Sequence, residues 1–530
     1  MSKNSLARSL RAAPLIVRPS RPLRQRSWRT AVSACSVLIR RMSLYGSFRA
    51  SHLPGIASRL VSPSKLSAWA GTKQARQIVY GLFIAQVIYL IFAMRIGVPP
   101  DELTHIRFIE YYKEHSLSPF IEGQESSFFL GDITREVSYL YHYVSSLIMR
   151  LLPLGSLAGY VVLRFVSLAL AFGTLVMSAK LGRLLKIPEH IITIGLFVIT
   201  NASEFLLMSA AINNDQVVWL AAASGLYLLV KAWQEGMSLR ILLLLASIVL
   251  LTSVAKKTFL PVGAVLALIA AVLAWRARAN MLTELRKIRW PEIVLLIVML
   301  VSLGLFVERI GNNIVRYGSI DVRCDAIHST EQCLQYGVFR RNYRLDREGP
   351  PPVLAFRQFA PSWWHRTLER VFGPQAWTGT TPPAIWFTKI IHGLVILSLV
   401  GAATVARKKQ PIDRQRIFVF LLGLAYIIFN MLFNYQLYQR WGTFSLALQG
   451  RYIFPVIVPL VLVAAYFISL LAKKLNPIIS RSLVLILLVL VLTQSGLRQI
   501  LRTDEFVRYP LAPQILFDTD NAIAPYEPGI

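Results

Sequence analysis

About eleven long apolar segments run through the sequence, and they constrain its fold more than any other feature. Each is about 17–22 residues long, which is what an α-helix needs to cross the roughly 30 Å hydrocarbon core of a bilayer. Because that core offers no water to the backbone, each crossing segment must satisfy its own hydrogen bonds, and helices do so. The sequence therefore predicts an all-α integral membrane protein with about eleven transmembrane helices. The segments are residues 78–96, 158–179, 189–210, 216–232, 239–255, 258–275, 291–309, 383–405, 416–434, 452–472 and 481–498.

The composition supports a membrane protein and argues against nucleic acid as a partner. Hydrophobic residues make up 55% of the chain and charged residues only 16%, whereas a soluble chain carries about a quarter charged residues. The net charge of +30 is gathered at the amino terminus and in short loops, and no base-reading module is present. We therefore expect membrane lipids as partners and no nucleic acid.

The distribution of Lys and Arg predicts the orientation of the spans. Cytoplasmic loops carry an excess of these residues. The basic loops fall on one side if the amino terminus is cytoplasmic and each segment crosses once, which places the carboxyl terminus outside, as expected for a multi-pass protein of the plasma (inner) membrane. The loop residues are Lys180, Arg183 and Lys186, then Arg276, Arg278, Arg286, Lys287 and Arg289, then Arg407, Lys408, Lys409, Arg414 and Arg416, and finally Lys473, Lys474 and Arg481.

Three parts of the chain are predicted. Residues 1–76 form a basic arm with no acidic residue, which suits a disordered cytoplasmic segment on anionic lipid, an organelle transit peptide or a plain extension. Residues 77–500 form the membrane domain, with external loops 97–157 and 310–382 that carry short interfacial helices. Residues 501–530 form an external tail. In the second loop Cys324 and Cys333 are candidates for a disulfide in an oxidising compartment, or two unpaired thiols.

The strongest local signal follows the first span, in the stretch Pro-Pro-Asp-Glu-Leu-Thr-His. Asp101 and His105 are four residues apart and would share one face of a helix, next to Glu102. A carboxylate at a partly desolvated membrane surface can take a proton from a hydroxyl or hold a metal. The simpler alternative is that Asp101 caps an interfacial helix.

Two further polar clusters fall in external turns. Asn214 and Asp215 lie between the third and fourth segments, where they are also ordinary turn residues. Lys256 and Lys257 lie between the fifth and sixth, against the positive-inside trend. A lipid phosphate or pyrophosphate would partner these lysines, while snorkelling to headgroups is the alternative.

The fourth cluster precedes the tenth segment. Gln449, Arg451 and Tyr452 stand at the mouth of this span, where an arginine can clamp a phosphate or a carboxylate. Arg440 lies in the same loop and can contact a sugar. An interfacial Arg-Tyr pair is also common anchoring chemistry. The convergence of four clusters on one membrane face favours a site over anchoring.

These elements together resemble an uncharacterised bacterial family of multi-spanning membrane proteins. The shared pattern is PDExxH after the first span, NND after the third, a lysine turn after the fifth and QGRYxxP near the end. That family is similar to the GT-C membrane glycosyltransferases, which include protein O-mannosyltransferases and lipid A aminoarabinose transferases. The match covers residues 78–500, and it departs from the family at Leu103-Thr104.

The resemblance implies a glycosyltransferase that uses a polyprenyl-phosphate-linked sugar. Asp101 would be the catalytic base or a metal-adjacent carboxylate, with Glu102 and His105 as companions, so a divalent metal is an open question. We interpret Lys256, Lys257 and Arg451 as phosphate-binding residues because they are positively charged and are expected on the external side of the membrane. Two alternatives stay open: a transporter or flippase of lipid-linked saccharides, and a non-catalytic subunit of an envelope assembly.

Overall fold

The computed structural model describes most of the membrane domain. The described residues lie between 68 and 502. The basic arm, apart from its last residues, and nearly all of the expected external tail lie outside them. The residues within that range that the structure does not describe are 116, 121–134, 153–154, 350–351, 377–378, 381, 408–409, 445–447, 473–490 and 492.

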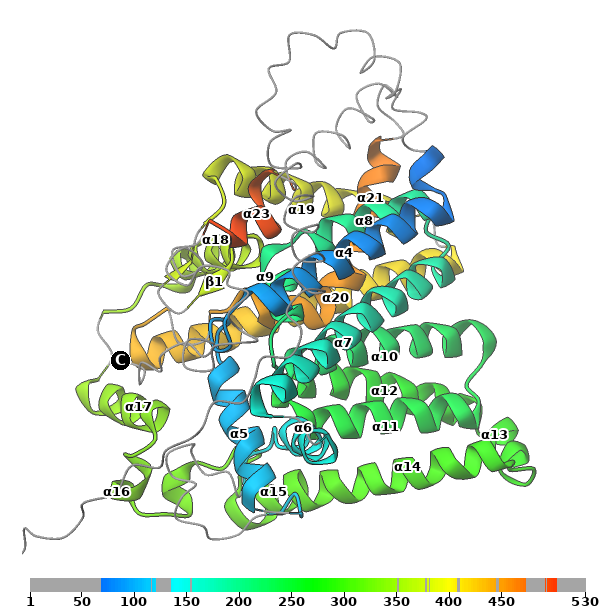
Figure 1. Ribbon diagram of the computed structural model, residues 1–530. Coiled ribbons are helices and arrows are strands. Elements are labelled where there is room, and N and C mark those ends of the chain that lie inside the picture. Colours follow the sequence, from blue (N-terminus) through cyan, green and yellow to red (C-terminus); the bar gives the residue numbers. More distant parts are fainter. Residues whose placement is uncertain are drawn as a thin grey trace, which may run out of the picture. The chain divides into compact units, whose positions relative to one another are not determined.

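The protein is an all-α, multi-pass membrane protein, as predicted (Figure 1). In the described part, eight helices are long and apolar enough to cross a bilayer, or nine if a bent pair counts as one span. With the shorter α11, these follow the first ten predicted segments in order; most of the eleventh, residues 481–498, lies outside the described residues. The spans use α4 (Lys73–Ala93), α7 (Ser156–Leu184), α8 (Glu189–Thr200) with α9 (Ser203–Ser209), α10 (Asp215–Glu235), α11 (Leu239–Ala255), α12 (Leu260–Arg276), α14 (Trp290–Phe306), α19 (Ile385–Ala406), α20 (Pro411–Trp441) and α21 (Phe454–Ala472).

The third predicted segment, residues 189–210, is not one straight helix. The chain bends by 73° between α8 and α9. The side chain of Asn201 at the bend donates a hydrogen bond of 2.8 Å to the carbonyl of Phe197, which competes with continuation of the helix. Ser203 then fixes the start of α9, because its hydroxyl lies 3.2 Å from that of Ser495. The predicted segment 189–210 is therefore a bent pair of helices.

An aromatic cluster joins the helices that carry the functional side chains. The ring of Trp219 on α10 stacks on Phe205 of α9, with 5.1 Å between centroids, and lies 5.1 Å from the ring of Phe454 at the start of α21. All three residues are fully buried or nearly so. Burial of such large rings gives each helix a fixed position relative to the others, so the ends of α10 and α21 are rigidly placed.

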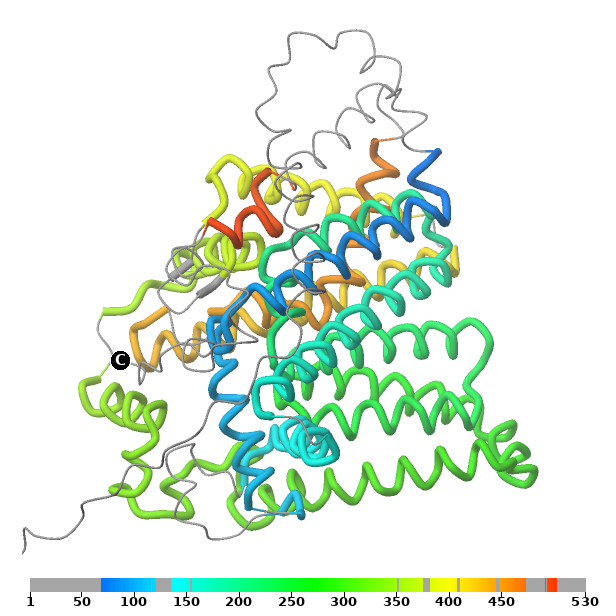
Figure 2. The backbone as a smooth tube through the Cα atoms, in the orientation of Figure 1, coloured from blue at the N-terminus to red at the C-terminus, as the bar shows by residue number. Residues whose placement is uncertain are grey.

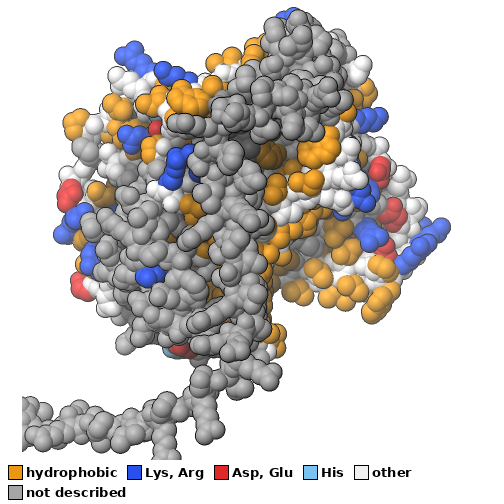
Figure 3. Space-filling model, turned by 45° about the horizontal axis from the view of Figure 1, so that its top comes forward, with side chains coloured by type: hydrophobic (Ala, Val, Ile, Leu, Met, Phe, Trp, Pro, Cys, Tyr) orange, Lys and Arg blue, Asp and Glu red, His pale blue; other side chains and the backbone are white. Residues whose placement is uncertain are grey.

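The outer surface of the helices suits lipid. Large apolar side chains on α14 are exposed, among them Ile297 and Val301, and hydrophobic side chains cover broad areas of the described surface in Figure 3. Lipid tails solvate such side chains as well as a protein core does. The exposed apolar faces are thus consistent with membrane-spanning helices.

Short helices form the two predicted external loops. The first loop contains α5 (Glu102–His115) and α6 (Leu140–Leu151). In the second, α14 continues through a π-helical turn (Val307–Gly311) into α15 (Asn312–Tyr317), followed by α16 (Thr330–Cys333), α17 (Gly337–Glu348) and α18 (Phe356–Phe372). Two-residue strands β1 (Gln375–Ala376) and β2 (Gly379–Thr380) pair antiparallel. Short connecting helices are α13 (Arg278–Leu285) and α23 (Leu497–Ile500).

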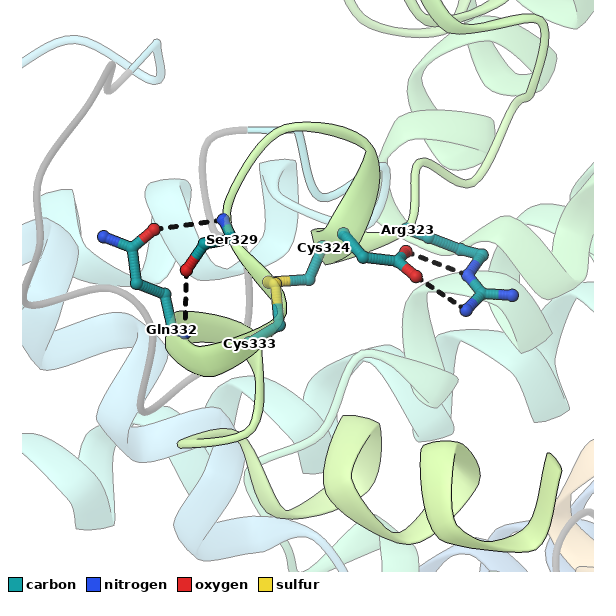
Figure 4. Close-up of a disulfide and its surroundings, with 6 residues drawn as sticks. Arg323, Cys324, Ser329, Gln332 and Cys333 are labelled. Carbon is teal, nitrogen blue, oxygen red and sulfur yellow. Dashed lines mark hydrogen bonds and ion pairs between the residues drawn. A yellow bond between two sulfur atoms is a disulfide. The ribbon is translucent and has the colours of Figure 1, made fainter. Parts of the chain in front are cut away.

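A disulfide closes part of the second loop. Cys324 and Cys333 are bonded through their sulfurs, with 5.8 Å between Cα atoms (Figure 4). Ser329 begins α16, and its side chain and that of Gln332 exchange hydrogen bonds with each other's backbone amides in a capping box. The loop therefore has a covalent and a local hydrogen-bonded constraint.

Candidate functional site

Asp101 directly precedes α5, which begins at Glu102, and Figure 2 shows the chain turning between α4 and α5. Its φ of 64° is in the left-handed region, which Asp tolerates better than most residues. The carbonyl of Asp101 accepts the first hydrogen bond of α5, from the amide of His105 at 3.0 Å. Its carboxylate contacts the guanidinium of Arg451, 350 residues later in the chain. The turn thus presents the Asp101 carboxylate to the start of α21.

Glu102 points in the opposite direction, into the protein. Its carboxylate pairs with Arg164 of α7, at 2.9 Å and 2.7 Å, and both side chains are fully buried. It also accepts hydrogen bonds from the amides of Gly97, at 2.7 Å, and Ile212, at 2.9 Å. Arg164 in turn donates to the carbonyl of Met94, at 2.7 Å. With both oxygens engaged in this way, Glu102 is placed to fix the turn rather than to react.

Arg451 is the centre of the site. It belongs to a 3-10 turn (Gly450–Ile453) that leads into α21, and its side chain is only 2% exposed. Besides Asp101, its Nε lies 3.4 Å from a carboxylate oxygen of Asp215 and 2.6 Å from Oε1 of Gln449. It also donates to the carbonyl of Pro100, at 3.2 Å. One buried arginine therefore joins the first, second and fourth of the predicted clusters.

Lys256 completes the cluster from the side of α11. Its Nζ lies 2.6 Å from Asp215 and donates to Oδ1 of Asn214 at 2.8 Å. The amide of Asn214 donates to the carbonyl of Ala255 at 3.1 Å. Burial lowers the pKa of Lys256, against the opposing effect of Asp215. We call Asp101, Asp215, Lys256 and Arg451 the four-charge cluster.

The four-charge cluster is balanced in formal charge but unequal in exposure. The side chain of Asp101 is 43% exposed, whereas those of Asp215, Lys256 and Arg451 are 4%, 12% and 2% exposed. A buried charge without a partner is costly, which explains why the two cations and two anions lie together. Only Asp101 can leave the cluster and reach solvent or a ligand without exposing a buried helix end.

His105 contacts a second histidine that the sequence analysis did not single out. Its Nδ1 lies 2.7 Å from Nε2 of His142 on α6, and Nδ1 of His142 lies 3.0 Å from the carbonyl of Ser138. Burial lowers the pKa of His142 to about 3. Burial, and then the charge of His142, lowers the pKa of His105 well below its usual value. Both rings are therefore neutral at physiological pH.

The buried histidines predict a loss of stability in acid. The unfolded chain binds protons at His142 below pH 6.5, whereas the folded chain binds them only near pH 3. The contribution of His142 to stability is thus complete above pH 6.5 and is expected to fall by about 1.4 kcal/mol per pH unit between these values, and His105, whose pKa is also lowered, adds to the loss. Thermal denaturation of the purified protein from pH 7.5 to 4.5 measures it. His142→Gln should reduce the slope by the contribution of His142, and an unchanged slope in that variant would contradict the assignment.

Two predicted site residues, Lys257 and Arg440, pair with carboxylates of the second loop rather than with the four-charge cluster. Lys257 pairs with Asp321 of the second loop at 2.5 Å. Arg440 makes two hydrogen bonds of 2.7 Å to Asp346 on α17. Tyr452 lies next to the four-charge cluster, since its ring centroid is 5.8 Å from the guanidinium carbon of Arg451. Lys257 and Arg440 instead attach the second loop to the ends of the spans.

Metal ligands are not gathered in the described part of the chain. No group of three or more His, Cys, Asp and Glu side chains there is close enough to hold a metal ion. Asp101 and Asp215 both face Arg451, and His105 faces His142. The chemistry that this arrangement itself offers is a carboxylate base beside two cations that can bind an anion.

Comparisons with known proteins show a structural likeness to an archaeal oligosaccharyltransferase. No protein-family model and no curated protein matches the chain. The crystal structure of the Archaeoglobus fulgidus oligosaccharyltransferase tethered with an acceptor peptide aligns over 86% of this chain and 60% of that one, at 9% identity and a TM-score of 0.39. AglB of the same organism, in complex with an inhibitory peptide and a dolichol-phosphate, aligns over 85% and 56%, at 10% identity and a TM-score of 0.40.

The chain thus spans less than two thirds of the length of these neighbours. The side chains of the site therefore carry the functional argument.

Proposed function

We propose that the protein is a GT-C-like membrane glycosyltransferase that uses a polyprenyl-phosphate-linked sugar on the non-cytoplasmic face. Its acceptor would be a glycan, lipid or protein of the cell envelope. The observation that carries this proposal is the four-charge cluster, in which a half-exposed carboxylate, Asp101, rests against the buried Arg451. The positive-inside rule favours an external position for the ends of α4, α9 and α11 and for the start of α21.

The arrangement supports a mechanism with inversion at the sugar. The donor phosphate replaces the Asp101 carboxylate on Arg451, and the freed carboxylate accepts the proton of the acceptor hydroxyl. The hydroxyl oxygen bonds to the anomeric carbon as the bond from that carbon to the phosphate oxygen breaks. The leaving lipid phosphate keeps the electron pair, and Arg451 and Lys256 stabilise its charge. Donor binding would thus activate the base.

Lys256→Gln is the variant that tests phosphate binding. We expect roughly a tenfold higher KM for the lipid-phosphate sugar, because one charged contact to the phosphate is lost, with a smaller effect on the acceptor. Initial rates of labelled-sugar transfer in membranes would measure both constants. Lys287→Gln, an exposed lysine in the loop after α13, is the control. Equal KM values in wild type and Lys256→Gln would contradict a phosphate role.

A transporter of lipid-linked saccharides is the second candidate, because the bend between α8 and α9 is a feature of such proteins. All seven residues of α9 are buried, however, and Ser203 ties it to Ser495. That packing fits a fixed element better than a moving gate. Sealed vesicles that accumulate the saccharide without covalent product would support the transporter and contradict the enzyme.

A further inference from the structure

A cavity lies at the far end of α10, the helix that begins at Asp215 of the four-charge cluster. Its volume is about 440 Å³, within the usual range for small-ligand sites. α10 begins at Asp215, in the cluster, and its last turn contributes Trp233 and Gln234 to the cavity. The first turns of α20 and Lys186, just after α7, complete the wall.

The charges that line this cavity are all positive. Lys186 and Arg414 contribute two exposed cations, and none of the described lining residues is acidic. The nearby Asp413 is buried and paired with Arg416, at 2.6 Å, so it does not neutralise them. In the described part of the chain neither Lys186 nor Arg414 has a carboxylate partner. The cavity therefore offers two available cations to an anion.

The walls are braced by side-chain hydrogen bonds. Arg416 donates to the carbonyls of Leu185, at 2.8 Å, and Lys186, at 3.2 Å. The amide of Gln234 donates to Gln415, at 2.6 Å, and to the carbonyl of Leu184, at 3.0 Å. These bonds tie the end of α7 to α10 and α20. These bonds therefore hold the segments that carry Lys186 and Arg414 in fixed positions.

The left-handed φ of Lys186 belongs to the C-terminal cap of α7, in which the amides of Lys186 and Ile187 donate to the carbonyls of Arg183, at 2.8 Å, and Gly182, at 2.9 Å. Among the described residues, only Asp101 and Lys186 combine a side chain with a positive φ, of 64° and 54°. Glycine would fit the position of Lys186 without strain. A lysine held here keeps its charge at the rim of the cavity.

We propose that this cavity binds a phosphate group of an anionic lipid headgroup or of a soluble phosphate ester. Basic residues at a membrane surface attract anionic phospholipids, and the half-exposed Trp233 is of the type that sits at headgroup level. The positive-inside rule places this end at the cytoplasmic face, away from the proposed transfer site. The inference does not depend on the protein being a transferase.

Thermal stabilisation of the full chain by defined ligands tests this. Purified protein in neutral detergent would be titrated with phosphatidylglycerol, with phosphatidylcholine, and separately with inorganic phosphate and glycerol phosphate. We expect phosphatidylglycerol to raise the Tm and phosphatidylcholine to have little effect. Stabilisation by the soluble phosphates at similar concentration would assign the site to a phosphate ester. No response to any phosphate would overturn the proposal.

Lys186→Gly provides a variant that cannot be mistaken for misfolding. It removes the charge and relieves the left-handed strain, so its Tm without ligand should rise while its apparent affinity falls roughly fivefold. Arg414→Gln should weaken binding by a similar factor, and the double variant by roughly 25-fold. Lys180→Gln, an exposed lysine on α7 outside the cavity, is the matched control. An equal loss of affinity in the control would show that binding reflects general charge attraction, and it would overturn the proposed site.

Discussion

Replacing Asp101 with Asn is expected to lower sugar transfer by about 10²–10⁴-fold, the usual contribution of a general base. Asn keeps the shape of the side chain and tolerates the φ of 64°. It cannot take a proton from an acceptor hydroxyl. Transfer of labelled sugar from polyprenyl-phosphate-sugar pools, in membranes with matched amounts of wild type and variant, measures the loss.

The control for this variant is Asp321→Asn. Asp321 is a carboxylate of the second loop that also pairs with a basic residue, Lys257, yet it lies outside the four-charge cluster. Its substitution should leave the rate within about twofold, since exposed ion pairs contribute little. If Asp101→Asn were as active as this control, the proposed mechanism would be wrong and the transporter would become the leading candidate.

Glu102→Gln is expected to destabilise the protein by about 3–5 kcal/mol, the usual cost of breaking a buried ion pair. The reason is that Arg164 would keep its charge at a site with no exposure to solvent. Denaturant titration of the purified protein in mixed micelles would measure the change in the free energy of unfolding. Arg164→Met should cost a comparable amount, because it leaves the Glu102 carboxylate buried and unpaired.

Two measurements separate this structural role from a catalytic one. The pair of changes together should cost less than the sum of the single changes, since the two residues interact directly. Lys231→Ala breaks a surface pair with Glu235 and should change stability by less than about 1 kcal/mol. A variant Glu102→Gln that is stable but inactive would contradict the positioning role and return Glu102 to the chemistry.

The spans could be predicted from the sequence because bilayer thickness imposes a length that apolar runs reveal directly. The break after Thr200 could not, because it depends on the Asn201 amide and on Ser203 meeting Ser495. Ser203 and Ser495 are nearly 300 positions apart. Each of the three residues by itself is ordinary in a membrane helix. Such contacts are set by tertiary packing, which hydropathy does not encode.

The convergence of Asp101, Asp215, Lys256 and Arg451 agrees with the topology inferred from Lys and Arg in the loops. The sequence did not separate these residues from Lys257 and Arg440, because all are expected at the same membrane face and all carry charged side chains. Their partners decide which site they join, and those partners, Asp321 and Asp346, lie in the second external loop. Sequence position alone cannot show which way a side chain turns.

Arg164 and His142 were missed although a signal for Arg164 was present. Arg164 is a charge inside the apolar segment 158–179, and intramembrane charges usually have a partner. Following that rule would have led to a nearby acid such as Glu102. His142 gave no comparable signal, because its importance comes only from its 2.7 Å contact with His105.

The left-handed backbone at Asp101 makes the change that would raise stability also the change that would remove a candidate functional group. A designer who seeks thermostability would place Gly at this position, because Gly relieves the strain of a φ of 64°. The same change would delete the carboxylate that faces Arg451. Stability-guided redesign of this protein would therefore favour a substitution that we expect to abolish the proposed activity, and position 101 should be held fixed in any such library.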